Sequence, residues 1–288
     1  MAIQSQDQLI AALTAGKSAR TDWNKITGAT AYAAGRWYDF SQLSGQPVAN
    51  TYAGTGLAFT PATEASVFAL PLGSSVLPDF KHLLNLAAWT TSATGVPGTL
   101  QLVDVQGYWP GISLNTATAQ TLTGTPSMRY ANGAGLRLFL AATVASGAVA
   151  HTIGVSYTNQ AGVSGRSLPV TVSGTVSAIP AHLLHSGTAA NNYGPFLPLA
   201  AGDSGIQNVA SVTLSAASGA GTAALVLARP LAQITLSVTG LMTEKDLLNQ
   251  IPSLPRILDG ACLVWLYGSG AATAASSTFA GSLECVWG

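Results

Sequence analysis

Charged residues are scarce in this sequence. Asp, Glu, Lys and Arg make up 8% of it, against about a quarter of an average soluble domain. Eleven acidic and eleven basic residues cancel, and no acidic residue occurs between Asp104 and Asp203. Such a chain has no field to attract nucleic acid or an anionic membrane, so neither is an expected partner. Because a monomer with so few surface charges tends to associate, we expect partner subunits to cover much of its surface.

Two further features are nearly absent. The only cysteines are Cys262 and Cys285, too few for a disulfide framework and without metal-binding spacing, so we expect two buried thiols. No long apolar run is uninterrupted: the stretch 136–155 contains an arginine, a histidine and glycines, which argues against a transmembrane helix. Residues 1–7 lack the basic start and apolar run of a secretion signal, so none is expected.

What the sequence does contain is a repeated block. Residues 126–136 read PSMRYANGAGL and residues 252–263 read PSLPRILDGACL. Three more matches recur in the same order: Phe68–Leu72 with Phe196–Leu199, Leu84–Ala88 with Val212–Ala217, and Gly98–Val103 with Gly221–Val226. Matches in constant order at a nearly constant offset predict an internal duplication.

The matched blocks are short apolar runs bounded by Gly, Pro or Asn, which is typical of strands. Asn132-Gly133 and Asp259-Gly260 are turn signals placed before such runs. We therefore predict an all-β chain of two tandem, duplicated, jelly-roll-like β-sandwiches, preceded by a short N-terminal helical arm. The predicted divisions are an N-terminal region 1–64 (helix, arm and aromatic-rich extended region), sandwich 65–175, linker 176–192 and sandwich 193–288.

Two local predictions concern helix and arm. Ser5 and Gln8 form a capping box that predicts a short helix ending near Gly16. The charged segment 17–25, which carries Trp23, is interpreted as an arm that docks on another subunit, because Trp23 would otherwise be an exposed aromatic. A second helical turn is predicted over Thr243 to Gln250.

One stretch suggests a catalytic site. Gly202-Asp203-Ser204-Gly205 resembles the nucleophile loop of chymotrypsin-like serine proteases, and His82, Asp104 and Ser204 occur in that family's order. However, Ile206 replaces the family's next glycine, and His82 stands in Phe-Lys-His-Leu-Leu rather than among small residues. The duplication also aligns this loop with the plain loop 73–75. We therefore expect no triad.

Other candidate sites are weaker. His82, His182 and His185 could form a metal cluster, but no acid lies between Asp104 and Asp203 to complete a set of ligands, so surface or interface histidines are the preferred interpretation. Asp39 and Glu64 are isolated acids, and no Walker loop or dinucleotide fingerprint occurs. No catalytic, cofactor-binding or metal-binding residue is therefore assigned, no cofactor is expected, and the chain is not expected to be an enzyme.

Arg129 and Arg256 are rare charges kept in both copies of the repeated block. Each guanidinium could satisfy backbone carbonyls at the turn that follows, or it could contribute to subunit contacts. The two interpretations are compatible.

Three segments carry a family resemblance: residues 7–12 (DQLIAA), 16–25 (GKSARTDWNK) and 246–256 (DLLNQIPSLPR). They resemble virion structural proteins of tailed bacteriophages. The resemblance implies a capsid decoration or cement protein that stabilises the phage head as a homo-oligomer, often a trimer. Its partners would be the major capsid protein or other virion subunits, and it would be located in the virion after assembly in the host cytoplasm. No catalytic residue carries over.

Two alternatives to a decoration protein stay open. One is a principal capsid shell subunit of the tandem jelly-roll type. The other is a carbohydrate-binding module of a phage fibre, in which Trp37, Tyr38, Tyr108 or Trp109 would stack on sugars.

Overall fold

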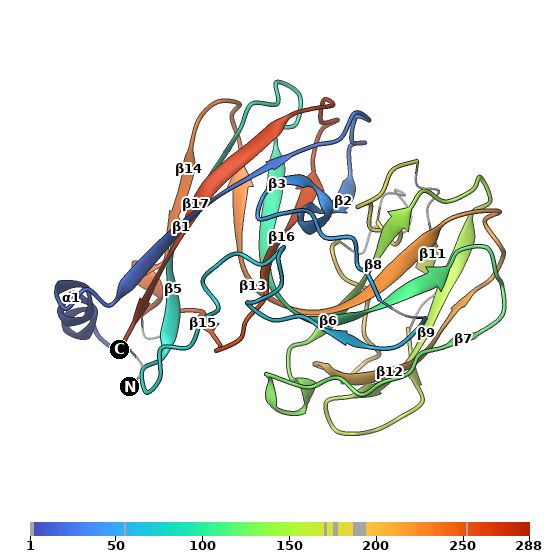
Figure 1. Cartoon of the computed structure of the whole chain (residues 1–288), viewed down its shortest axis with the longest axis horizontal. Helices are drawn as coiled ribbons and strands as arrows, with labels where there is room; N and C mark the ends of the chain where they lie inside the picture. Colours follow the sequence, from blue (N-terminus) through green and yellow to red (C-terminus); the bar gives the residue numbers. More distant parts are fainter. Residues whose placement is uncertain (1–2, 55, 170–171, 175–177, 187–193, 252) are drawn as a thin grey trace.

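The computed structural model describes residues 3–54, 56–169, 172–174, 178–186, 194–251 and 253–288. It contains antiparallel sheets and one short α-helix, α1 (Gln6–Thr14), which confirms the predicted all-β sandwich class (Figure 1). Of the predicted linker 176–192, residues 176–177 and 187–192 lie outside the described residues. Within the described ranges, no helix has the length and apolar composition needed to cross a membrane.

Two outer sheets flank a central one. The first outer sheet consists, in spatial order, of β14 (Thr243–Asp246), β5 (Lys81–Thr90), β17 (Thr278–Trp287), β1 (Ser18–Ile26) and β3 (Ser44–Gln46), with β15 (Arg256–Ile257) also paired to β5. The second consists of β10 (Arg166–Ser167), β9 (His151–Asn159), β12 (Ile206–Leu214) and β7 (Gln120–Thr121), with β11 (Val172–Gly174) paired to β9.

The central sheet has the longest strands. Its order is β2 (Arg36–Asp39), β16 (Leu263–Ser269), β6 (Gly98–Ser113), β13 (Thr222–Leu236) and β8 (Arg137–Val144), and β4 (Thr60–Pro61) pairs with β6. Three short 3-10 helices lie between strands: η1 (Phe40–Gln42), η2 (Ala131–Gly133) and η3 (Leu248–Gln250). Figure 1 shows the curved strands β6 and β13 passing from one outer sheet to the other.

The central sheet is covered on both faces. On β16, Trp265 and Tyr267 belong to the core shared with the first outer sheet, whereas Val264 and Leu266 belong to a separate core on the opposite face. A strand buried on both faces has no reason to alternate apolar with polar residues. The continuous apolar run of β16 follows from this position.

A segment outside the named strands closes the central sheet. His182 bridges to Tyr38 of β2, and Leu183 bridges to Ala141 of β8. The Leu183 N–H donates to the Trp37 carbonyl of β2, and the Ala142 N–H of β8 donates to the His182 carbonyl, both at 2.9 Å. Residues 181–184 therefore cover both edges of the sheet, which curls around the core that contains Phe139 and Val226.

The two copies of the repeat are interlaced. Strand β5 pairs with β17 in the first outer sheet, and the strands with matching sequence, β12 and β9, pair in the second. In the same way β6 pairs with β16, and β13 pairs with β8. Each sandwich therefore combines strands from residues 65–175 with strands from residues 193–288. The predicted ranges describe repeated sequence units, and they do not separate the sandwiches, because complementary strands come from opposite copies.

The N-terminal helix is confirmed: the Ser5 side chain caps α1 by accepting a hydrogen bond from the Gln8 N–H at 3.2 Å. The docking-arm interpretation of residues 17–25 is wrong. This segment is β1, hydrogen-bonded between β17 and β3 of the same chain. Trp23 is buried, with its ring 5.4 Å from that of Trp265. Packing within the chain therefore provides the cover that a partner was expected to supply.

The predicted helical turn over Thr243–Gln250 is also corrected. Residues 243–246 form β14, which pairs with β5 from Thr243 opposite Ala88 onwards, and only Leu248–Gln250 are helical. The local sequence favours a helix, but an available strand edge outweighs such a weak preference.

Candidate functional site

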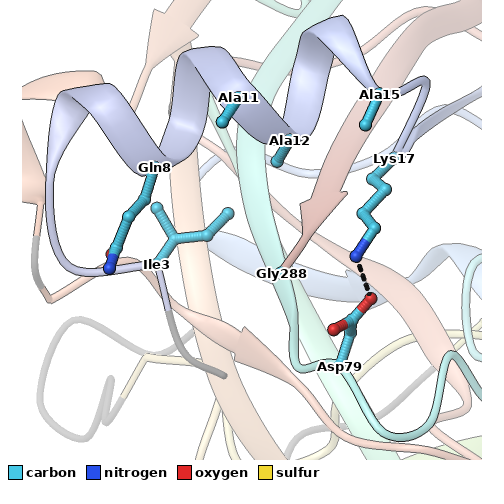
Figure 2. Close-up of a pocket in the computed structure, with 8 residues that line it drawn as sticks. All are labelled: Ile3, Gln8, Ala11, Ala12, Ala15, Lys17, Asp79 and Gly288. Carbon is cyan, nitrogen blue, oxygen red and sulfur yellow. Dashed lines mark hydrogen bonds and ion pairs between the residues drawn. The ribbon is translucent and has the colours of Figure 1, made fainter.

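An apolar pocket lies beneath α1, at one end of the first sandwich. Figure 2 shows the helix above it, with Ile3 and Gly288 at its floor. The cavity measures about 280 Å³, and the helix contributes mainly alanines to its wall: Ala11, Ala12 and Ala15. Short side chains on this face of the helix leave space between the helix and the sheet.

The sequence of α1 explains its orientation. Leu9 and Ala12 are buried against the outer face of the first outer sheet, where they join Leu84 and Val286. Ile10 and Leu13 point to solvent, with exposed fractions of 61% and 39%. The helix thus presents apolar side chains outward as well as inward.

One ion pair borders the pocket. The Lys17 ammonium donates a hydrogen bond to the Asp79 carboxylate at 2.7 Å (Figure 2). This bond lowers the pKa of Asp79. Both side chains are partly exposed, so the pair adds little to stability. It marks the polar rim of an otherwise apolar surface.

A second exposed apolar surface is the loop 237–242 between β13 and β14. Val238, Leu241 and Met242 are each more than half exposed. The loop is anchored to the end of β5, because the Gly240 N–H donates to the Thr90 carbonyl at 2.9 Å. It lies at the opposite end of the first sandwich from α1 (Figure 1).

Neither the surface of α1 nor that of loop 237–242 was identified from the sequence. An apolar triplet around a Thr-Gly turn was the available signal for this loop.

The Gly-Asp-Ser-Gly loop is held as a structural turn. The Asp203 carboxylate accepts hydrogen bonds from Tyr157 (2.6 Å), Asn159 (2.7 Å) and Arg166 (2.9 Å). The bond from Arg166, followed by that from Tyr157, lowers the pKa of Asp203 to about 2. With these acceptor sites filled, the carboxylate fastens the loop to the second outer sheet.

The alignment of this loop with residues 73–75 has a structural counterpart. A Cβ atom on Gly205 would lie 2.1 Å from the Gly133 carbonyl oxygen, and one on Gly73 would lie 2.1 Å from the Ala261 carbonyl oxygen. Both loops therefore pack tightly on the turn that leads into a central strand, and in both a glycine is required at the contact.

The structure does not assemble the suspected triad. His82 lies on β5, with its Nδ1 3.4 Å from the Leu254 carbonyl oxygen. Asp104 lies on β6 of the central sheet, where its carboxylate forms an ion pair with Arg129. Ser204 is in the loop before β12, and its N–H donates to Gln160. Each residue has a different set of neighbours.

His82, His182 and His185 are all buried within the chain, so the interpretation as surface histidines is wrong. His182 packs against Tyr38, with ring centroids 5.4 Å apart, and His185 is fully buried. Burial lowers the pKa of His182 to about 3 and that of His185 to about 4. Among the residues that the structure describes, no group of three His, Cys, Asp or Glu side chains could hold a metal ion.

Both cysteines are buried and unpaired, as predicted.

The aromatic candidates for sugar stacking lie mainly in the core. Tyr38, Tyr108 and Trp109 are buried, so their rings are not available to a sugar. Trp37 is half-buried and borders a cavity of about 290 Å³. Of the four aromatic residues named for the carbohydrate-binding alternative, Trp37 alone is partly exposed.

The two repeated arginines differ. Arg129 forms a two-point ion pair with Asp104, through Nη2 at 2.6 Å and Nε at 3.3 Å, and donates to the carbonyls of Ala62 and Val105. Arg256 is exposed and stacks over the Phe80 ring at 3.9 Å. Arg129 therefore does satisfy backbone carbonyls, but those of Ala62 and Val105 rather than the predicted ones of the turn that follows it. At Arg256 the contact seen is with an aromatic ring.

Comparisons with known proteins assign no family to this chain. No family model matches the chain, and no curated protein matches it. Among solved structures, the chain is similar to the infectious bursal disease virus VP2 subviral particle. The two are 10% identical, the match covers 94% of this chain and 80% of that one, and the TM-score is 0.21. A likeness at this score assigns neither a fold family nor a function.

Proposed function

We propose that this chain is a virion structural protein, most specifically a decoration or cement subunit that stabilises the head of a tailed bacteriophage as a homo-oligomer, with a trimer favoured. The observation that carries the proposal is the exposed apolar surface at both ends of the first sandwich, on a chain with 8% charged residues. Exposed apolar patches on weakly charged proteins are typical of surfaces that partners cover.

The interlaced fold supports this role. Because β6 and β13 run through both sandwiches, the two outer sheets are joined by shared strands rather than by a flexible linker. A rigid body with separated contact surfaces suits a subunit that bridges neighbours on a symmetric lattice. The proposal assigns the chain no catalytic role.

The surface contribution is tested with a matched pair of variants. Replacing Leu241 and Met242 by serine is expected to reduce self-association, because it removes apolar area from loop 237–242. Replacing Val163, which is 52% exposed in a loop of the second sandwich, is expected to have no such effect. Light scattering after size-exclusion chromatography gives the mass of each variant. Monomers at every concentration for the unmodified chain would contradict the proposal.

The same preparation distinguishes decoration from shell. Phage heads assembled without this chain are mixed with the purified protein, and electron microscopy shows whether it binds their surface. A decoration protein binds the preformed heads and forms no closed shells alone. Closed shells formed by the purified chain alone would instead identify a principal shell subunit.

A further inference from the structure

A cavity of about 400 Å³ lies where β13 passes between the two sandwiches. Leu231 on one wall packs against the core of the first sandwich, and Leu258 on the other packs against the core of the second. The remaining walls come from Tyr130, from Arg229 and Pro230 on β13, and from Pro255 and Arg256 around β15. Two arginines thus share a cavity whose other walls are mainly apolar.

Both guanidinium groups are held by aromatic rings. The Arg229 guanidinium carbon lies 4.3 Å from the centroid of the Tyr130 ring, and that of Arg256 lies 3.9 Å from the centroid of Phe80. The Tyr130 ring is itself fixed, because its hydroxyl donates to Asp104 at 2.9 Å. Stacking orients a guanidinium plane while leaving its N–H edges free to bind a ligand.

These N–H edges have no acceptor in the part of the chain that the structure describes. Among the described residues, neither Arg229 nor Arg256 forms an ion pair or a side-chain hydrogen bond. The Asp104 carboxylate, on the residue opposite Arg229 in the pairing of β13 with β6, is already bound by Arg129 and Tyr130. The cavity lining therefore contains two arginines and no acidic residue, in a chain whose net charge is zero.

We propose that this cavity binds an organic carboxylate. The fork of an arginine matches the two oxygens of a carboxylate, and two arginines in the lining of one cavity supply two such charged donors. The proline and leucine walls would cover an apolar carbon body attached to it. A volume of this size is within the usual range for small-molecule sites, about 300–1,000 Å³. The inference is independent of the proposed assembly role.

The test uses benzoate, with benzamide as a neutral ligand of the same shape. We expect benzoate to shift the NMR signals of the Arg229 and Arg256 Nε–H groups saturably, and benzamide to leave them unchanged. Arg256→Gln is expected to weaken benzoate binding about ten-fold or more, because it removes one charged fork. Arg20→Gln, at a 63% exposed side chain that is not among the residues lining the cavity, is the control and should bind normally.

Arg256 is exposed, so its replacement is not expected to unfold the chain, and circular dichroism verifies this. Arg229→Lys keeps the charge but removes the fork, and it should also weaken binding. Absence of a saturable shift with benzoate, equal shifts with benzamide, or unchanged affinity in Arg256→Gln would each overturn the proposal. Inorganic phosphate binding as tightly as benzoate would overturn the assignment to an organic carboxylate.

Discussion

Arg129→Ala and Arg256→Ala are expected to differ sharply in their effect on stability, although both arginines occupy the same position in the repeated block. Arg129 has a side chain only 14% exposed, and its partner Asp104 is completely buried. Arg256 is exposed and contacts the Phe80 ring. The two variants therefore compare the loss of a buried ion pair with the loss of an exposed cation–π contact, at equivalent positions of the repeated block.

The magnitude follows from what each substitution leaves behind. Burial raises the pKa of Asp104, and the hydrogen bond from Arg129 is the main opposing influence. Without Arg129, a buried carboxylate keeps only neutral donors, Tyr130, Gln106 and the Cys262 N–H. Breaking a buried ion pair on one side costs about 3–5 kcal/mol. Loss of an exposed cation–π contact costs about 0.5–1 kcal/mol.

Urea unfolding followed by tryptophan fluorescence and circular dichroism measures both effects. With a slope of about 3 kcal/mol per M, Arg129→Ala should lower the midpoint by about 1 M or more. Arg256→Ala should lower it by about 0.3 M or less. Equal shifts in the two variants, or a loss below about 1 kcal/mol for Arg129→Ala, would refute the reasoning from burial.

Three further predictions concern buried and paired groups. The pKa values of His182 and His185 are lowered in the folded state, so the unfolded chain binds more protons below about pH 6.5 and stability decreases as the pH falls toward about 4. When the pH is lowered from about 7.5 to about 5, the urea midpoint should therefore decrease. The decrease should be smaller in a variant with glutamine at both positions. An unchanged midpoint in the unmodified chain would contradict this prediction. Asp203→Asn should lower the unfolding midpoint because it weakens the bond to Arg166, whereas Ser204→Ala should not, and equal losses would show that the loop is not fastened through the carboxylate. Both cysteine thiols are buried with raised pKa values, so a thiol reagent should label them only in urea; rapid labelling of the native chain would show that they are accessible.

Features fixed by neighbours in the sequence were predictable. The cap of α1 is one example, since Ser5 and Gln8 are three residues apart and need no distant partner. The strands were predictable for a similar reason, because each apolar run between turn residues favours an extended conformation. The duplication also allowed the Gly202–Gly205 loop to be identified as an ordinary turn.

The pairing of the strands within each sheet was not predictable. The two copies have similar sequences, so nothing local shows whether β5 should pair with β9 or with β17. Residues 18–26 present the same difficulty, because their partner β17 lies almost the whole chain away. An unpaired charged strand and a docking arm cannot be distinguished until that partner is known.

The candidate sites were missed for a related reason. The cavity with Arg229 and Arg256 depends on two segments that come together only through the interlaced sheets. From the sequence, Arg229 is an isolated charge before a proline. Its significance depends on Tyr130 beneath it, which is contributed by the other copy of the repeat.

The sharing of β6 and β13 has a consequence for synthesis on the ribosome. The second sandwich takes its strands from β6 to β13, so it can form once β13 has left the exit tunnel. The first sandwich must wait for β16 and β17. During that interval β5 and one half of β6 expose apolar faces and open edges, which is the condition in which nascent β-proteins mispair with one another. A chaperone that binds the nascent chain would be most useful between the emergence of β13 and that of β17.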